Sequence, residues 1–575
     1  MRKFTSILAM FFIGTAVFLA SCDKDEDPPK PAPTLTASSS TLSVITDTTA
    51  TVTVDISAAA GIKDITATLD KSELGTVEIT NKADLLTKTV GTATIKFTSL
   101  FELGSGTVTV TVTDDASQTG TKTIAVTVTN HPPIEISGTM GDTGTKEYHI
   151  TDAATWGPHL TYHVTGNVFV EAEGSLTLME GTTVIVDGQY SFTVRGNFYS
   201  YGTEEDSVVF TVPAEQHKKE NIFAGLWGGV LSSDTDGDND FAADEMVVQY
   251  TRFEFTGMVG QAWQDIVKLG EVEETVPGYA LFFNNPDGVC VIQNSTFAYT
   301  TDVAVQVDQG KILITNNAFI LNGKAGGEAI DTKVGTNGDI AYNLFYKSAT
   351  NGVKYNAKNG SADLRVYNNT AVECGWRQTE HSNHGGSFNV EQGGKGKLHN
   401  NLIVNCTRGV RFSDGKLPDV AELSVGYNFH YVAFNEAVGV DAYTPQFYPE
   451  DGFIIRGNGA TGPDVDSTFS TSHDIPTPVY TAEQYDEAAT IAASVDPKFE
   501  NFVVTTFTKA LAETSEEPSN EDFPAAFDFH LKAGSPALTG GNTDFSPYNT
   551  SSLSINGKTY TIPQPSAFFG AFGTK

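Results

Sequence analysis

The chain has 575 residues, of which 39% are hydrophobic, 10% aromatic and only 18% charged. This composition excludes a disordered chain and a coiled coil, and a count of 4 cysteines excludes a disulfide-dense mini-protein. The 35 Lys and Arg residues stand against 70 Asp and Glu residues, which gives a net charge of -35. Because this charge repels phosphate backbones and anionic lipid heads, we expect no nucleic-acid partner.

The N-terminus has the pattern of an export signal. Two cations precede an apolar run over residues 7–19, which has the length of a secretory signal core and is short for a membrane-spanning helix. Leu, Ala and Ser then precede Cys22, and this pattern resembles a bacterial lipobox. The resemblance implies that residues 1–21 are removed and that Cys22 is lipidated, so that the lipid is the membrane anchor. An ordinary secretion signal and a membrane-spanning helix are the alternatives.

Residues 22–33 are predicted to form a tether. Residues 23–27 hold four carboxylates and residues 28–33 hold four prolines, a composition typical of a stiff, solvated spacer. An acidic run directly after a lipidated cysteine resembles the surface-export signal of Bacteroidota lipoproteins. The resemblance implies a chain anchored in the outer membrane and facing the cell exterior, and a solvated linker without a signal is the alternative.

Residues 34–130 are predicted to form a small β domain. Polar and β-branched apolar residues alternate at 51–56, 108–113 and 121–128, which predicts half-buried strands. A segment of this length and pattern resembles a bacterial immunoglobulin-like (Ig-like) β-sandwich. No cluster of His, Cys or carboxylates suggests chemistry here, so we expect a spacer, with ligand binding as the alternative.

Beyond residue 133 the sequence contains a repeat. Six turn segments recur at steps of 22, 26, 26, 32 and 27 residues, and they begin at Asn294, Asn316, Tyr342, Asn368, Asn400 and Tyr427. Short strands at such a period, without any helical pattern, predict the coils of a parallel β-helix. We expect the asparagines of these turns to stack and hydrogen-bond to one another, and Phe297, Phe319 and Phe345 to stack inside the coil.

Four sequence motifs resemble those of a known family, and they lie at residues 173–182, 202–211, 226–229 and 528–538. They resemble the right-handed parallel β-helix repeat (PbH1) proteins of the pectate-lyase-like superfold, over residues 135–575 with a long excursion near 441–518. The resemblance implies an all-β chain, with an N-terminal Ig-like β-sandwich followed by a right-handed parallel β-helix. The superfold includes pectate lyases, glycoside hydrolases and adhesins, so it implies no single activity.

The densest acidic motif predicts a calcium loop over residues 234–245. Oxygen ligands fall at positions 1, 3, 5, 7 and 12, and they are Asp234, Asp236, Asp238, Asp240 and Glu245. The glycine at position 4 and the flanking apolar β sequence depart from the EF-hand pattern. The motif resembles the looser Asp-x-Asp-Gly-Asp calcium loops of extracellular proteins, and a solvated acidic loop is the alternative.

The strands after the aligned turns predict two outward polar rows, because alternate residues of a strand face opposite sides. The first row holds Gln306, Asp331, Lys354, Asn389 and Arg411, and the second holds Asp308, Lys333, Asn356, Glu391 and Ser413. We expect both rows to be exposed, either to bind a glycan or to perform acid–base chemistry, with solubilising charge pairs as the alternative. The candidate catalytic residues are Asp331, Lys354, Arg411 and Glu391.

One lengthened turn is predicted to overhang these rows. Residues 374 and 388 are 14 positions apart, against 5 and 4 in the matching intervals of neighbouring coils, and long solenoid loops commonly bind ligands. The candidate ligand-binding residues are Trp376, Arg377 and His381 of this turn and Asn389 of the first row. We expect Trp376 to stack on a sugar ring. A zinc site from His381 and His384 is a further alternative.

Three cysteines remain after lipidation, namely Cys290, Cys374 and Cys406. Cys374 and Cys406 share a repeat column on adjacent coils, where a strand spacing of about 4.8 Å falls within the range of a disulfide. A disulfide between these two cysteines and a reduced, stacked pair are the two alternatives.

Together these features predict a cell-surface lipoprotein that is non-catalytic and binds polysaccharide or another extracellular ligand along the β-helix face. The alternatives are a polysaccharide lyase or glycoside hydrolase on the same face, and a structural stalk or adhesin. Polygalacturonases of this superfold carry Asn-Thr-Asp, Asp-Asp, Gly-His-Gly and Arg-Ile-Lys signatures in that order. Here the only late Asn-Thr-Asp, at residues 542–544, follows the lone His384-Gly385, and Arg-Ile-Lys is missing, which favours binding without excluding catalysis. Ca²⁺ is the one cofactor predicted, and the sequence gives neither the ligand nor the oligomeric state.

Cys22→Ser removes the predicted lipid attachment site. We expect cells to incorporate labelled palmitate into the wild-type chain and not into the variant, and proteinase added to intact cells to degrade the wild-type chain. Survival of the chain under conditions that degrade a known surface protein would contradict its exposure at the cell surface.

Overall fold

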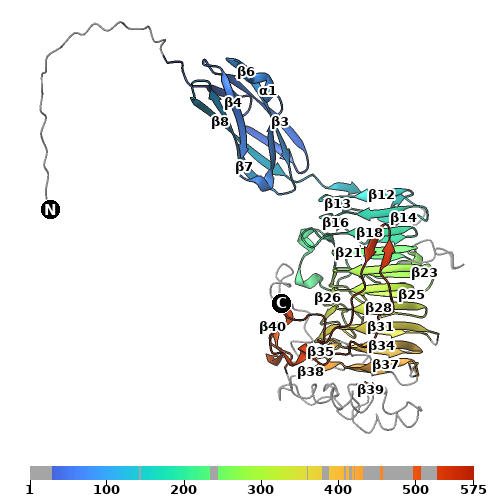
Figure 1. Cartoon of the computed structure of the whole chain (residues 1–575). Helices are drawn as coiled ribbons and strands as arrows, with labels where there is room; N and C mark the ends of the chain where they lie inside the picture. The colour runs from blue at the N-terminus through green and yellow to red at the C-terminus, as the bar shows by residue number, and fades with distance from the viewer. Residues whose placement is uncertain are drawn as a thin grey trace, which may run out of the picture. The chain divides into compact units, whose positions relative to one another are not determined.

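The structure is a computed structural model, and the chain divides into two compact units, Met1–His131 and Pro132–Lys575. It describes residues 29–141, 144–232, 244–358, 360–377, 387–406, 409–412, 418–419, 421–431, 454–456, 496–506 and 527–575 (Figure 1). The predicted export signal, with Cys22, lies outside these residues. Within them, no helix is both long enough and apolar enough to cross a bilayer.

The first unit contains two four-stranded sheets that share one core. One sheet has the order β1-β3-β6-β5, with β1 (Thr34–Ala37), β3 (Thr49–Ser57), β6 (Val90–Ser99) and β5 (Gly75–Ile79). The other has the order β2-β8-β7-β4, with β2 (Thr41–Ile45), β8 (Thr119–Thr129), β7 (Gly104–Asp114) and β4 (Ile62–Leu69). The alternating sequence points Val54 and Ile56 of β3, and Val110 and Val112 of β7, into this core.

The second unit is a stack of parallel strands (Figure 1). Successive coils add one strand to an 11-stranded sheet and either two strands or one longer strand to a 20-stranded sheet. The strands pair in parallel from coil to coil except at the short β10 (Thr139–Met140). This all-β architecture with long parallel sheets is consistent with the predicted β-helix.

The stack has three faces, which we name A, B and C. In the middle coils, face A consists of the first half of β25 (Val305–Thr315) followed by β27 (Ile330–Thr332), β30 (Val353–Asn356), β33 (Phe388–Glu391) and β36 (Val410–Phe412). Face B consists of the second half of β25 followed by β28 (Thr336–Ala341), β31 (Ala362–Tyr367) and β34 (Gly394–His399). Face C is the 11-stranded sheet, with β26 (Ala318–Ile320), β29 (Leu344–Tyr346) and β32 (Thr370–Val372).

The predicted asparagine column is confirmed as a continuous buried ladder. The first residue of each aligned turn has a left-handed backbone, with φ between 51° and 60°. The second residue forms the ladder, whose members are Asn317, Asn343, Asn369, Asn401 and Asn428. Each Nδ2 from Asn317 to Asn401 donates to the next Oδ1 at 2.9–3.0 Å, and each of the five donates to a backbone carbonyl at 2.9–3.1 Å. Side-chain amides therefore tie each of these coils to the next.

The predicted phenylalanine stack is also confirmed. Phe297, Phe319 and Phe345 are fully buried inside the coil, and their ring centroids lie 5.2 and 5.4 Å apart. Phe253 extends the stack by one coil, 5.1 Å from Phe297. One aromatic ring per coil thus fills the interior at the spacing of the strands.

The C-terminal residues return along the outside of the stack and cover face B. The hairpin of β42 (Leu553–Ile555) and β43 (Lys558–Tyr560), drawn in red in Figure 1, packs on the outward side chains of Tyr199, Tyr201 and Val247. In a lower coil, the Tyr367 hydroxyl donates to the carbonyl of Pro563 at 2.6 Å. An apolar outward stripe is therefore buried by the end of the same chain.

The C-terminal residues also cover part of face C. The Tyr346 ring on β29 contacts Phe502, Phe527 and Phe529, with centroids 5.6–6.2 Å apart. Within the excursion expected near residues 441–518, β39 (Ile454–Arg456) pairs in parallel with β36. The stack therefore continues through a part of the chain where the sequence shows no repeat.

Asn343→Ala deletes one rung of the ladder and leaves buried amide groups without partners. We expect the free energy of unfolding to fall by about 2 to 4 kcal/mol, since each orphaned buried polar group costs about 1 to 3 kcal/mol. Urea unfolding followed by circular dichroism measures this loss. The exposed Asn130→Ala is the matched control, and an equal midpoint for the two variants would contradict a stabilising role of the ladder.

Candidate functional site

The first polar row has the predicted register on face A. Gln306 pairs with Asp331, Asp331 with Lys354, Lys354 with Asn389, and Asn389 with Arg411. The apolar residues between them, such as Val353 and Tyr355, face the core. The alignment of these strands is therefore confirmed, side chain by side chain.

The expected exposure of both rows is wrong for their nine described members, none of which is exposed, and the tenth, Ser413, lies outside the described residues. Gln306, Asp331, Asn389 and Arg411 are between 0% and 4% exposed, Asp308 and Glu391 are buried as well, and Lys354 keeps 22% of its side chain in contact with solvent. Lys333 and Asn356 are partly buried. A strand pattern gives only the direction of a side chain, and here segments between the strands and neighbouring side chains close over the face.

One such segment is the excursion over residues 257–280. Ile266 on its single-turn helix α2 (Asp265–Lys268) and Val272 pack on outward Leu231 and Phe282 of face A. Arg195 holds the excursion through Asp265, at 3.0 Å between Nε and Oδ2. The excursion also carries Glu271 to the polar rows.

The partly buried centre of face A is an ion-pair cluster around Lys354. Lys354 Nζ lies 3.4 Å from Glu328 Oε1 and 3.6 Å from Asp331 Oδ2, and Lys333 Nζ donates to the same Asp331 oxygen. Burial opposes charge on Asp331, but Lys333 and Lys354 outweigh it and lower its pKa. Burial likewise opposes charge on Lys354, and Asp331 and Glu328 outweigh it and raise its pKa.

Two carboxyls beside this cluster have raised pKa values, in contrast to the lowered pKa of Asp331. Burial, followed by the charge of Asp308, raises the pKa of Glu271 to about 7. Burial, followed by the charge of Glu328, raises the pKa of Asp302 to about 7. Both carboxyls are partly accessible, and partly accessible groups with displaced pKa values are typical of functional sites.

The lower end of the rows is a buried amide and ion-pair group. Asn389 Nδ2 donates to Glu391 Oε1 at 2.8 Å, and Asn356 Nδ2 donates to Glu391 Oε2 at 3.2 Å. Arg411 Nη1 lies 3.8 Å from Glu391 Oε1, and both residues are 1% exposed. Glu391 and Arg411 are thus enclosed, and in this arrangement neither offers a charged group to solvent.

We name ten residues of face A and its turns the acid–base seam: Glu271, Asp302, Asp308, Glu328, Asp331, Lys333, Lys354, Lys358, Glu391 and Arg411. Every cation of the seam lies no more than 3.8 Å from a seam carboxylate, including Lys358, which is 3.6 Å from Asp308. Asp331 Oδ1 is buried and has no hydrogen-bond partner. The side chains of the seam can therefore bind or release protons and form hydrogen bonds with a ligand. Each of its cations is already paired with a carboxylate.

The expected sugar platform at Trp376 is corrected by the structure. Trp376 is 5% exposed, and its indole Nε1 donates to the carbonyl of Asn405 at 2.7 Å. Arg377 is 6% exposed and donates to two backbone carbonyls. Both side chains turn inward because burial satisfies the indole N–H and removes its large apolar surface from water. His381 and His384 lie outside the described residues.

The predicted calcium loop lies mainly outside the described residues, as Asp234, Asp236, Asp238 and Asp240 do. Its last member, Glu245, accepts a hydrogen bond from the Tyr199 hydroxyl at 2.6 Å. Across the part of the chain that the structure describes, no group of three or more His, Cys, Asp or Glu side chains is arranged to hold a metal ion.

The three cysteines are buried and free. The backbone N–H of Cys374 donates to Cys406 Sγ at 3.3 Å, so the two share the predicted column as a stacked pair without a bridge. Of the two alternatives for this pair, the structure has the reduced one.

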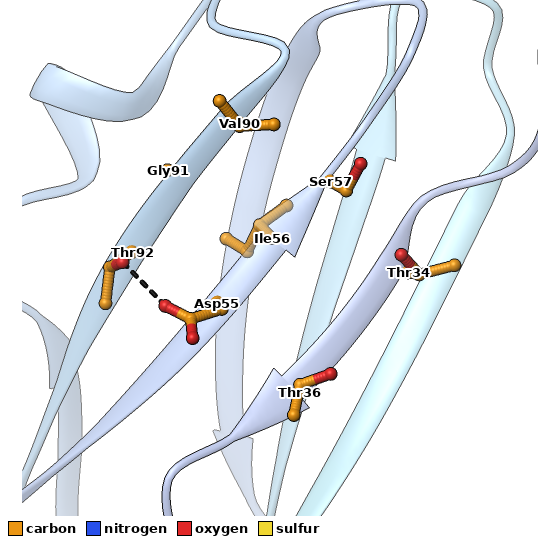
Figure 2. A pocket seen from close by; sticks show the side chains of 8 residues that line it. All are labelled: Thr34, Thr36, Asp55, Ile56, Ser57, Val90, Gly91 and Thr92. Carbon is orange, nitrogen blue, oxygen red and sulfur yellow. Dashed lines mark hydrogen bonds between the residues drawn. The ribbon is translucent and has the colours of Figure 1, made fainter.

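The first unit has a shallow hollow on the outer face of β1, β3 and β6 (Figure 2). Its lining residues are Thr34, Thr36, Asp55, Ile56, Ser57, Val90, Gly91 and Thr92. Thr92 Oγ1 donates to Asp55 Oδ1 at 2.6 Å, as the dashed line in Figure 2 marks. With its single carboxylate engaged in this way, the hollow offers hydroxyl groups and no acid–base pair.

Sequence reasoning missed four members of the seam, Glu271, Asp302, Glu328 and Lys358. Lys358 stands two residues after Asn356 of the second row, in the turn that follows β30. Asp302 and Glu328 stand three and two residues before the first apolar residue of their strands, so an alignment that included the preceding turn finds them. No sequence signal connects Glu271 with Asp308, because only the folding of the excursion brings them together.

Comparison with models of protein families gives no match, and comparison with curated proteins gives none. Among solved structures, domains 4 and 5 of the S-layer protein SbsC are 21% identical over 17% of this chain, with a TM-score of 0.14, and the chain spans 53% of their length. The BIgI domain of β protein from S. agalactiae, solved bound to CEACAM1, is 24% identical over 17% of this chain and 99% of its own, with a TM-score of 0.13. At such scores these likenesses carry no argument about fold or function.

The raised pKa values of Glu271 and Asp302 predict a pH-dependent stability. Both groups bind protons more tightly in the folded chain, so their contribution is fully present below the ordinary carboxyl pKa and is lost as the pH rises through about 7. Glu271→Gln with Asp302→Asn imitates the protonated carboxyls, and we expect this double variant to lose less stability than wild type between pH 4 and pH 8.

Urea unfolding at both pH values measures the difference. Glu273→Gln, an exposed carboxyl in the same excursion, is the control and is expected to follow wild type. An identical decline in the double variant and in wild type would show that the two carboxyls titrate as in the unfolded chain.

Proposed function

We propose that the protein is a lipid-anchored cell-surface protein whose right-handed parallel β-helix binds an uncharged polysaccharide at the acid–base seam. The N-terminal unit then serves as an Ig-like spacer between the anchor and the binding body. The binding site in this proposal is centred on Lys354 rather than on Trp376.

The observation that carries the proposal is the accessibility of the seam around Lys354. Lys354, Asp302, Glu271 and Asn356 are partly accessible residues, and their side chains offer both donors and acceptors. Sugar hydroxyls both donate and accept, so such a mixed row suits a glycan. The C-terminal residues cover part of faces B and C in their middle coils, whereas the row around Lys354 on face A stays partly accessible.

The charge of the seam favours an uncharged ligand. Its six carboxyls exceed its four cations by two, and each cation already has a carboxylate partner. A uronate or sulfate would gain no unpaired cation and would meet the net charge of -35 of the whole chain. A neutral polymer needs neither to displace an ion pair nor to overcome this repulsion.

The lyase alternative is disfavoured by the state of Lys354. A lyase needs a base that is neutral at the working pH, and the raised pKa of Lys354 keeps its ammonium protonated. Arg411, the other candidate base, is 1% exposed beside Glu391. Binding therefore agrees with these two residues better than proton abstraction does.

An array of neutral and acidic polysaccharides tests the proposal, scored both for retention and for release of reducing or unsaturated ends. We expect retention of a neutral polymer without release, and about 5-fold weaker binding by Lys354→Gln, because one lost hydrogen bond is worth about 1 kcal/mol. Lys532→Gln, at an exposed lysine, is the control.

Three outcomes would contradict the proposal. Retention of acidic polymers alone would contradict the argument from charge, and release of product would favour the enzymatic alternative. Failure to retain any polysaccharide would leave the stalk or adhesin alternative.

A further inference from the structure

Arg377 is a buried cation that forms no ion pair with any residue in the described part of the chain. Its guanidinium lies 5.0 Å above the centre of the Phe223 ring, and Nη2 donates to the carbonyls of Asn322 and Gly323 at 3.1 and 2.9 Å. Nε and Nη1 are buried and have no hydrogen-bond partner among the residues that the structure describes. Three segments far apart in sequence thus meet around one guanidinium, two of whose three nitrogens are unused.

Arg377 is protonated, and therefore positively charged, at neutral pH. Burial lowers its pKa, but only to about 10, so the group stays protonated. Among the residues that the structure describes, no carboxylate lies within ion-pair distance of it, and the nearby Glu373 faces Lys347 instead, at 3.8 Å. A buried cation that has neither a counter-charge nor a full set of hydrogen bonds is strongly unfavourable.

Two further polar atoms, on the residue whose carbonyl accepts from Arg377 and on the next coil, are buried without partners among the described residues. Asn322, whose carbonyl accepts from Arg377, has an unbonded Oδ1, and Ser348, one coil further on, has an unbonded Oγ. Both residues are 0% exposed. Buried groups left unsatisfied together in this way are typical of a bound ion or water.

We propose that Arg377 is the centre of a binding site for a small inorganic anion of the size of chloride. The ion would accept from Nε and Nη1 of Arg377 and would supply the missing counter-charge. The enclosure of these atoms excludes a polymer substituent. The bound ion would join the turn that carries Arg377 to the segments of Phe223 and Asn322. This inference is independent of polysaccharide binding at face A.

Thermal unfolding in sodium chloride and in sodium gluconate of equal concentration tests the proposal, because gluconate is too large for an enclosed site while the ionic strength is the same. We expect the wild-type chain to unfold at a higher temperature in chloride, with a midpoint that rises with chloride concentration as binding to the folded state requires. Arg377→Met is expected to unfold at the same temperature in the two salts. Arg365→Met, at an arginine paired with Asp363 on face B, is expected to keep the difference.

Bromide in crystals of the wild-type protein gives a second measurement that does not depend on a folded variant. We expect an anomalous peak in hydrogen-bond contact with the Arg377 guanidinium. Equal midpoints of the wild-type chain in chloride and gluconate, or a water without anomalous signal at this place, would overturn the proposal. An equal chloride effect in wild type and Arg377→Met would overturn it as well.

Discussion

The parallel register from coil to coil is the constraint on which the rest of the structure depends, and the asparagine ladder enforces it. Each ladder amide bonds the next amide and a buried carbonyl, so a coil cannot slip without orphaning several polar groups at once. The left-handed residue before each asparagine aims the side chain into the column. Register then repeats every side chain at the strand spacing, which is why the rings stack inside and the charges align outside.

The alignment of opposite charges on face A explains how a protein with a net charge of -35 buries several charged side chains. Lys354 follows Asp331 in the same row one coil on, so their side chains start about one strand spacing apart. The strand register itself therefore places the two opposite charges within ion-pair distance. The carboxyls left over, Glu271 and Asp302, accommodate burial by holding protons more tightly. The same arrangement that stabilises face A therefore gives it groups that change charge near neutral pH.

Faces A and B are closed in different ways. Face B carries apolar outward residues, such as Tyr199 and Tyr201, beside charged pairs such as Arg365 with Asp363, and the C-terminal hairpin buries the apolar ones. Face A carries charges, which pair with one another and with the turns. The lengthened turn contributes Trp376 and Arg377 to the interior rather than to the surface, because the indole N–H and the guanidinium find carbonyls there.

The sequence by itself determined what repeats along it. The ladder, the phenylalanine stack and the pairing of Asp331 with Lys354 follow from positions that recur at a fixed step, because a parallel stack converts sequence period into spatial contact. Exposure was decided only by the tertiary structure. Whether an outward residue meets water depends on segments without a period, such as the excursion that carries Glu271 to Asp308, or Tyr548, whose backbone N–H reaches Asp339 across 209 residues. The local sequence pattern does not predict contacts between residues so far apart, since many paths of the chain could place the same residues elsewhere.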